Sequence, residues 1–553
     1  MTGRGLIISV GLLALISAVP AIADSRDNRD HCEEARDLTL VNGKIHTMDA
    51  QDSVVSTVSI RNGKFETVGR SDHSSNDTCT HLIDLHGRTA VPGLIDNHNH
   101  FVLLSLRPGH DTRLETAASI SDVQNTIRAR VPTVPLGAWI TSMGGWNPLN
   151  LAERRFPTLT ELDAAAPKNP VLLFQFFTGP GVTNSLGKAY FTAQGIAVDA
   201  TGTIAANAPS LAALNALRAI QTLDDQKQGA LDAMAYSAKV GVTTNVDMGG
   251  FVIPGTPYAQ DSYEIDTLAS WDPFTAYDAL LALHQENRMS VRLRIFFLTM
   301  DTDPDVPLVT QRVLNAFEHF GDDMMRMSGI GEFASSWPLF GNPYPTNYTN
   351  ALSIVAQRGW PFQQHSLSTP EDSFTLQTFQ TVNETYPIAD LHWSIAHVPT
   401  ITPDNIAAAK ALGVGLALHG FQYLVGSGGG PPYRSIVDSG IRAGAGSDSA
   451  QISTLDPWLM LYYMVTGRNG QGVLVNAGQT LTRAEALRLY TVANSWFFKE
   501  ENKLGSIEPG KLGDVVVIND DFFDEKRVPD EAIKHLQSVL TIVGGHVVYD
   551  ALR

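Results

Sequence analysis

The chain has 553 residues, of which 43% are hydrophobic and 17% are charged, and its formal net charge at pH 7 is −18. This is an ordinary globular balance, and the length suits either several domains or one long α/β barrel. The acidic charge argues against nucleic acid or an anionic membrane as a partner, and its simplest interpretation is solubility.

The N-terminus resembles a secretion signal. Arg4 precedes the apolar run Leu6–Val19, and Ala21-Ile22-Ala23 then offers a small-x-small cleavage site before Asp24. Because the run is too short to span a bilayer comfortably, we expect cleavage of residues 1–23 rather than an uncleaved anchor. The mature protein is then expected to be secreted or periplasmic, without a membrane contact.

The two cysteines, Cys32 and Cys79, both lie in the N-terminal part of the chain. In an oxidising compartment they could form one disulfide that staples an N-terminal module, and whether they do so stays open. Neither cysteine has a C-x-x-C partner or a histidine-rich neighbourhood, which argues against metal ligation and nucleophilic catalysis.

Both ends of the chain predict β-structure. Residues 37–70 alternate in hydrophobicity around the turns Asn42-Gly43 and Asn62-Gly63, which are hairpin signals. Near the C-terminus, Asp514–Ile518 is typical of a buried strand, and residues 540–549 predict a hairpin. The simplest arrangement joins the two ends in one β-module.

The middle of the chain predicts a (β/α)8 barrel. Apolar segments that are typical of buried strands alternate with helical segments such as Leu211–Gln228 and Pro273–Glu286. We therefore expect a barrel over residues 91–504, flanked by β-structure in residues 24–90 and 505–553. The strand candidates after the first are Val171–Phe177, Thr243–Val246, Val291–Phe297, Gly329–Phe333, Pro361–His365, Trp393–His397, Gly415–His419 and Ala443–Ser447.

The first strand candidate, Val91–His100, ends in a His-x-His motif. Residues i and i+2 of a strand point to the same side, so His98 and His100 would converge on one point where a metal could bind. Other histidines and a Gly-Ser-Asp end later strand candidates. Because the chemistry of such barrels lies at the carboxyl ends of the strands, this pattern favours a metallohydrolase.

Five segments of the chain resemble, in their order and spacing, segments of the amidohydrolase superfamily. Within it they resemble the amidohydrolase-3 group, which includes N-substituted formamide deformylases. The segments are Val91–His100, Gly144–Pro148, Val182–Ser185, Gly446–Asp448 and Leu504–Lys511. The resemblance spans nearly the whole mature chain. It implies a distorted (β/α)8 TIM barrel with a composite β-sandwich built from both chain ends, and one or two divalent metal ions, usually zinc.

The resemblance also implies a ligand set, which consists of His98 and His100 from the first strand, Glu332 as a bridging carboxylate, His365 and His397 from later strands, and Asp448 from the last strand. The chain departs from the group beside two of these ligands. Ser366-Leu367-Ser368-Thr369 replaces the usual Ala-Ile-Gly-Asp, and Ala396 replaces a glutamate. These changes leave hydrolysis plausible and put the substrate in doubt.

Such ligands support hydrolysis of a carbon–nitrogen bond. A divalent metal lowers the pKa of bound water to roughly 7 and polarises a carbonyl group, and imidazole and carboxylate ligands suit zinc. Asp448 would act as the general base that takes the proton of the water and passes it to the leaving nitrogen. We therefore expect an exported hydrolase of a small amide, formamide or carbamate that uses a metal-activated hydroxide.

Several alternatives stay open. The barrel could be an inactive binding or regulatory protein, or the same metal could serve an esterase, a lactonase or a deaminase. Asp448 could instead cap a helix, and Glu332 could form an ordinary salt bridge. Trp146 and His419 are weak candidates for substrate contacts, with packing roles as the alternative. Residues 249–275 are a candidate lid, and the oligomeric state is not readable.

Overall fold

The computed structural model of the chain describes residues 37–69, 81–176, 178–249, 276–299, 303–335, 347–425, 428–449 and 452–552. The signal segment, both cysteines and all but the first residue of the candidate lid lie outside these ranges, so the corresponding expectations stay predictions. Within the described ranges, no helix has the length and apolarity needed to cross a membrane.

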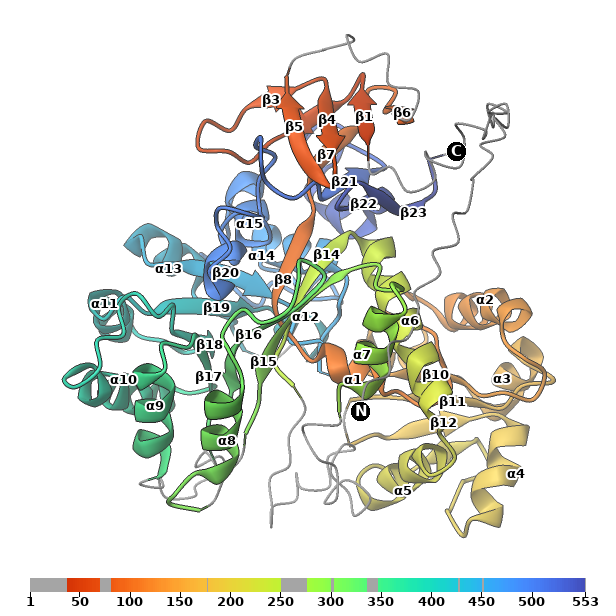
Figure 1. The fold of residues 1–553 in the computed structure, drawn as a ribbon. Helices are drawn as coiled ribbons and strands as arrows, with labels where there is room; N and C mark the ends of the chain where they lie inside the picture. The colour runs from red at the N-terminus through yellow and green to blue at the C-terminus, as the bar shows by residue number, and fades with distance from the viewer. Residues whose placement is uncertain are drawn as a thin grey trace, which may run out of the picture.

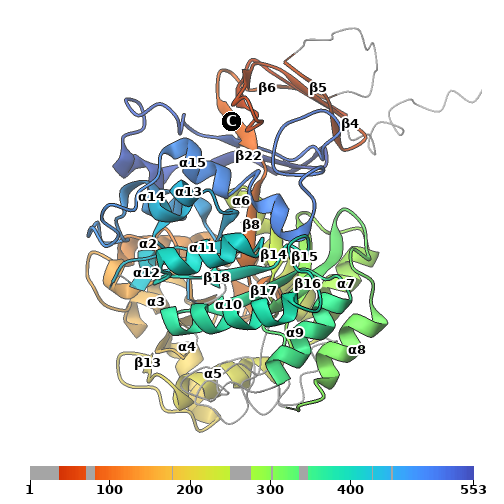
Figure 2. The same cartoon turned by 90° about the vertical axis from the view of Figure 1, so that its left-hand side faces the viewer.

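Eight parallel strands of the described residues form the barrel at the centre of the molecule (Figures 1 and 2). In order around the sheet they are β8 (Leu94–Asn99), β14 (Val242–Asp247), β15 (Arg292–Phe297), β16 (Met325–Glu332), β17 (Phe362–Ser366), β18 (Ser394–His397), β19 (Gly415–His419) and β20 (Ala443–Gly446). Backbone hydrogen bonds of 2.8 Å, from Asp448 N to His98 O and from His100 N to Ser449 O, link the segment after β20 back to β8. The predicted barrel is confirmed.

The barrel is a packed core with one end closed by a short 3-10 helix, η5 (Asn494–Phe498). Residues of several strands, among them Ile95, Val246 and Phe296, pack together with the aromatic side chains of η5. Gly415, at the start of β19, lies so close to Trp496 that a Cβ there would be 2.4 Å from the indole. The amino ends of the strands are therefore plugged, which leaves the carboxyl ends for a site.

Helices surround this sheet and bury its outer face in the largest hydrophobic core of the protein. They are α1 (Phe101–Ser105), α6 (Leu223–Val240), α7 (Asp278–Gln285), α8 (Pro307–Asn315), α9 (Asn347–Gln357), α10 (Thr369–Asn383), α11 (Pro403–Ala411), α12 (Gln422–Val425), α13 (Tyr433–Ser439), α14 (Pro457–Thr466) and α15 (Arg483–Leu489), with the 3-10 helix η6 (Asp530–His535) against α14.

The expectation that Val171–Phe177 is a barrel strand is wrong. The segment forms β11 (Val171–Phe174), which lies in a separate five-stranded sheet inserted between α1 and α6 (orange to yellow in Figure 1). The other elements of this insertion are β9 (His110–Asp111), β10 (Ile140–Met143), β12 (Gly181–Thr183), β13 (Thr203–Ile204), α2 (Ile120–Arg130), η1 (Val131–Thr133), η2 (Pro148–Asn150), α3 (Leu159–Ala165), α4 (Ser185–Ala193) and α5 (Ala208–Arg218). Since β11 is buried throughout, its composition matches that of a barrel strand, and only its partners distinguish the two.

The two chain ends form the predicted composite β-sandwich, seen in red and blue in Figure 1. A six-stranded sheet has the order β23-β22-β21-β7-β2-β3, and a four-stranded sheet has the order β5-β4-β1-β6. Their bounds are β1 (Leu38–Val41), β2 (Lys44–His46), β3 (Val54–Val55), β4 (Val58–Arg61), β5 (Lys64–Val68), β6 (His81–Asp84), β7 (Thr89–Pro92), β21 (Val515–Ile518), β22 (Ser538–Val543) and β23 (His546–Asp550).

Two of the three predicted hairpins are confirmed. Asn62-Gly63 joins β4 to β5, and Gly544-Gly545 joins β22 to β23, each as a two-residue turn between paired strands. The hairpin at Asn42-Gly43 is wrong, because β1 pairs with β4 and β6 whereas β2 pairs with β3 and β7. This turn carries the chain from one sheet of the sandwich to the other.

Candidate metal centre

Seven ionisable side chains meet at the carboxyl ends of the barrel strands. Since parallel strands end on the same face of a barrel, the last residue of each can reach the same space. The structure brings together all six predicted ligands and adds a seventh residue that the sequence analysis ranked low. The residues are His98 and His100 at the end of β8, Glu332 from β16, His365 from β17, His397 from β18, His419 from β19 and Asp448 after β20.

The His-x-His pair faces both carboxylates. His98 Nε2 lies 3.5 Å from Asp448 Oδ1 and 3.7 Å from Glu332 Oε2, and His100 Nε2 lies 3.4 Å from Asp448 Oδ1 and 3.6 Å from Glu332 Oε1. Two ligand atoms bound to one tetrahedral zinc ion at roughly 2.1 Å lie roughly 3.4 Å apart. The spacing of these four side chains therefore fits one shared metal ion.

A second group lies on the other side of Glu332. Its Oε2 atom is 2.8 Å from His365 Nδ1 and 3.0 Å from His397 Nε2, and these two nitrogens are 2.8 Å apart. These are hydrogen-bond distances, shorter than the edge of a tetrahedral metal site. Glu332 nevertheless lies between the two groups, as a bridging carboxylate must.

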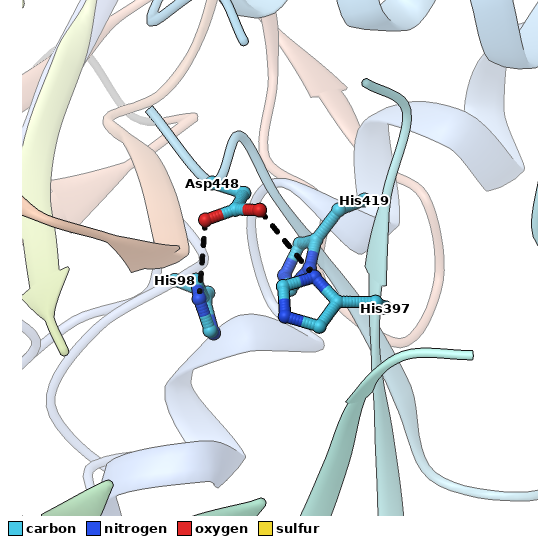
Figure 3. A group of neighbouring side chains, drawn as sticks. All are labelled: His98, His397, His419 and Asp448. Atoms are coloured by element: carbon cyan, nitrogen blue, oxygen red, sulfur yellow. Dashed lines mark hydrogen bonds and ion pairs between the residues drawn. The ribbon is translucent and has the colours of Figure 1, made fainter. Parts of the chain in front are cut away.

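A third group of side chains lies around Nδ1 of His397 and consists of His98, His397, His419 and Asp448 (Figure 3). His397 Nδ1 lies 3.5 Å from Asp448 Oδ2 and 2.7 Å from His419 Nδ1. With His98, these residues offer ligand atoms that all lie within 4.8 Å of one another. Asp448 thus stands between His98 on one side and the His397 and His419 pair on the other.

Burial and mutual charge set the protonation of the group. Burial opposes the ionisation of Glu332 and Asp448, but the neighbouring histidines outweigh it, above all His365 for Glu332 and His397 for Asp448, and hold both pKa values well below the usual range. Burial also opposes the charge of His100, yet the two carboxylates raise its pKa to about 9. Two ionised carboxylates in a buried pocket favour a cation.

Hydrogen bonds orient the rings of the His-x-His pair. His98 Nδ1 contacts Gln363 Oε1, and His100 Nδ1 contacts the carbonyl oxygen of Gly249 at 2.7 Å. Because both partner oxygens only accept hydrogen bonds, each Nδ1 carries a proton and each Nε2 is directed at the carboxylates. This is the orientation that a metal site needs.

Three buried nitrogen atoms support the same interpretation, namely Nε2 of His98, of His365 and of His419, none of which has a hydrogen-bond partner among the described residues. Buried polar atoms are usually paired, and a metal ion bound among these side chains would give the three nitrogens a partner. Together with the carboxylates, the imidazole nitrogens form a donor set that fits a divalent metal such as zinc.

The backbone at two of these positions is unusual. His397 has a φ of 70° and Asp448 a φ of 53°, in the left-handed region that residues with a side chain seldom occupy. Such conformations gather at functional sites, where the surrounding structure holds them in place. Asp448 does not cap α14, because Asp456 is the N-cap of that helix.

Trp146 is not brought to this centre. Its side chain is 3% exposed and packs in the core of the inserted sheet, where Nε1 donates a hydrogen bond to the carbonyl oxygen of Phe174. Of its two interpretations, packing is the one that the structure supports. His419 is the residue whose importance the sequence analysis missed, although it ends an apolar strand just as His397 does.

Comparisons with known proteins point the same way. The model of the amidohydrolase family matches residues 81–549. The protein LONG AFTER FAR-RED 3 of Arabidopsis thaliana is 24% identical over 93% of this chain and 91% of its own length. An N-substituted formamide deformylase of Arthrobacter pascens is 22% identical over 94% of this chain and 99% of its own length.

Solved structures share the fold. An uncharacterized metal-dependent hydrolase from Pyrococcus horikoshii superposes with a TM-score of 0.58 at 18% identity, over 88% of this chain and 98% of its own. A variant of the atrazine chlorohydrolase TrzN from Arthrobacter aurescens, complexed with zinc and atraton, gives a TM-score of 0.57 at 15% identity, over 93% and 96% of the two chains. Because the family model matches most of the chain, this chain belongs to the amidohydrolase family and is, as its sequence predicts, a metal-dependent hydrolase of carbon–nitrogen bonds.

Proposed function

We propose that this protein hydrolyses the carbon–nitrogen bond of a small amide, formamide or carbamate, with zinc as the resident metal. The observation that carries the proposal is the spacing of the two His-x-His nitrogens and the two carboxylates, whose contacts lie between 3.4 and 3.7 Å. The N-substituted formamide deformylase among the relatives favours this class of substrate.

The side chains divide into holding and reacting groups. His98, His100 and Glu332 would hold one ion, and His365 and His397 would hold a second one that shares Glu332. A bound divalent metal supplies a water of lowered pKa and polarises the scissile carbonyl group. Glu332 stays ionised in this role, because the neighbouring histidines hold its pKa well below its usual range in spite of burial.

Asp448 is the proposed general base. Because its pKa is held well below its ordinary value, its carboxylate is ionised at neutral pH and can accept a proton from the attacking water. The remaining hydroxyl adds to the carbonyl carbon, and Asp448 then gives the proton to the nitrogen as the carbon–nitrogen bond breaks. The products are a carboxylic acid (carbamic acid from a carbamate) and a neutral amine, so that atoms and charge balance.

Elemental analysis and a substrate panel test the proposal together. The protein starting at Asp24 is purified without chelator and assayed against N-formyl amines, other amides and carbamates, with esters and lactones as the competing class. We expect zinc in the purified protein, and activity that chelator removes and zinc restores. Metal-free protein with chelator-insensitive activity would contradict the proposal, and bound metal without any turnover would favour an inactive binding protein.

A matched pair of variants tests the general base. Asp448→Asn should lower kcat by about 10²- to 10⁴-fold, the usual contribution of general acid–base catalysis. Asp438→Asn is the control, because Asp438 is an exposed aspartate of α13 whose ion pair, within the described part of the chain, is with Arg434. Equal losses in the two variants would remove Asp448 from the reaction.

We also propose that the protein is exported. Support comes from the sequence alone, in the apolar run and the small-residue site that precede Asp24. N-terminal sequencing of the protein recovered from the medium or periplasm of an expressing bacterium should begin near Asp24. Recovery of the full-length chain from the cytoplasm would contradict this.

A further inference from the structure

His419 is the one member of the centre to which the family resemblance assigns no part. It is the last residue of β19, the seventh strand of the barrel, and its side chain is fully buried. Its ring centroid lies 4.3 Å from that of His98 and 4.6 Å from that of His397. The residue therefore stands inside the centre, not in the surrounding core.

Its hydrogen bonding is incomplete for a structural histidine. Nδ1 of His419 contacts Nδ1 of His397 at 2.7 Å, while Nε2 is buried without a hydrogen-bond partner among the described residues. Leaving a buried polar atom unpaired is costly, so a histidine kept only for packing would be expected to bond both nitrogens. The open nitrogen points to a ligand.

The groups around His419 are ones that bind metals. Its neighbours supply the rest of a coordination set, since Asp448 lies 3.5 Å from both His98 Nε2 and His397 Nδ1. Figure 3 shows these four side chains facing one another.

We propose that His419 is a metal ligand, which completes a buried site of three histidines and one aspartate together with His98, His397 and Asp448. Three imidazole nitrogens and one carboxylate oxygen are a donor set that zinc accepts. The inference rests on the proposed function in that both require a bound metal. It adds a ligand from the seventh strand to those that the family resemblance implies.

The arrangement has a consequence for His397. The Nδ1 atom of His397 faces His419 and Asp448, whereas its Nε2 atom faces Glu332 and His365. A neutral imidazole has one unprotonated nitrogen, so His397 can serve only one of these two sites at a time. We therefore expect the site around His419 and the site around His365 to be alternatives for one ion. Because His98 likewise offers only Nε2, an ion at the His419 site would also replace the ion held by His98, His100 and Glu332.

The test measures metal binding, without reference to turnover. Chelator-stripped protein starting at Asp24 is titrated with zinc in competition with a chromophoric chelator, and with cobalt(II) as a spectroscopic substitute. His419→Ala should weaken zinc binding at least about tenfold, shift the visible cobalt spectrum and shrink the rise in Tm that zinc produces. His392→Ala is the control, because His392 precedes β18 at the opposite end of the barrel, where Nδ1 bonds the carbonyl oxygen of Trp496 at 2.6 Å.

The outcomes separate the two claims. If wild type binds zinc and His419→Ala binds it with the same affinity, stoichiometry and cobalt spectrum, this inference is overturned and the proposed function stands. If wild type binds neither ion, both fail. Should His419→Ala not fold, His419→Gln replaces it, and an unchanged zinc-dependent rise in Tm would show a purely structural role.

Discussion

His98 of β8 and Gln363 of β17 meet inside the barrel, where His98 Nδ1 donates a hydrogen bond to Gln363 Oε1. The two strands are not neighbours in the sheet, and both side chains are fully buried. Since an amide oxygen only accepts, the bond places the ring proton on Nδ1 and leaves Nε2 for the carboxylates of the metal centre.

This contact predicts that Gln363 tunes the affinity for metal. Gln363→Leu removes the acceptor at similar size, so zinc binding should weaken by about 10- to 100-fold, as for other residues that orient a ligand. Gln363→Glu keeps an acceptor oxygen and should retain most of the affinity. A zinc titration of the two variants decides the matter, and equal affinity in wild type and Gln363→Leu would show that the contact does not orient His98.

A buried ion pair anchors the β-sandwich to the barrel. Arg292 of β15 binds Asp514, just before β21, through two hydrogen bonds of 2.7 Å, and the side chains are 2% and 4% exposed. Asp514→Ala would leave the buried guanidinium of Arg292 without its counter-charge. We therefore expect the free energy of unfolding to fall by about 3–5 kcal/mol, measured as a lower urea midpoint. Asp438→Ala breaks the exposed pair with Arg434 and should cost less than about 1 kcal/mol. Similar shifts in both variants would contradict the anchoring role.

Local patterns in the sequence were sufficient for the barrel, and together with the family resemblance they placed the candidate ligands at the ends of its strands. His98 and His397 each end a largely apolar segment that is long enough to be a strand, and the carboxyl ends of parallel strands meet by topology alone. Local patterns did not predict which strands pair with each other. Val171–Phe174 has the composition of a barrel strand, yet it pairs with β10 and β12 of another sheet.

In the metal centre, too, the sequence predicts where a residue lies along a strand but not which side chains it contacts. The sequence shows that His419 ends a strand, but the state of its nitrogens depends on His397, 22 residues away and on another strand. Likewise, the contact between His98 and Gln363 joins residues 265 positions apart. Which histidine bonds which acceptor is a property of the closed barrel, because the strands that carry the two groups are brought together only on folding.

Asp456 predicts how stability depends on pH. Burial, and then the nearby charge of Glu115, raise its pKa from the ordinary 3.8 to about 8. Because the folded pKa is the higher one, the carboxyl contributes stability at low pH that is lost as pH rises through about 8. The unfolding free energy of wild type should therefore fall between about pH 4 and about pH 8 more steeply than that of Asp456→Asn, which stays neutral.

The variant is expected to fold, because an asparagine can still accept the hydrogen bond from Trp458 N that caps α14. Urea unfolding at several pH values provides the measurement. Asp404→Asn, at the exposed start of α11, is the control for the loss of a charge in the first turn of a helix. Parallel pH profiles in wild type and Asp456→Asn would show that Asp456 does not titrate in this range.

Gly446, the last residue of β20, allows the barrel to close. A Cβ at this position would lie 2.6 Å from Asn97 Oδ1, 2.7 Å from His98 N and 2.9 Å from Asp96 Oδ1. The backbone nitrogen of His98 cannot move without shifting β8. Gly446→Ala should therefore separate β20 from β8. This would displace His98 relative to Asp448, whose Nε2 and Oδ1 atoms lie 3.5 Å apart when the barrel is closed.

We expect Gly446→Ala to cost about 1–3 kcal/mol of stability and to weaken zinc binding in the same variant. Gly429→Ala is the matched control, because the nearest atom to its added Cβ would be 3.6 Å away, an ordinary contact. Urea unfolding and a zinc titration on both variants separate the possibilities. If stability falls and zinc affinity does not change, the positions of the ligands do not depend on the contact between β20 and β8. Loss of both would show that the closure of the barrel sets the geometry of the metal centre.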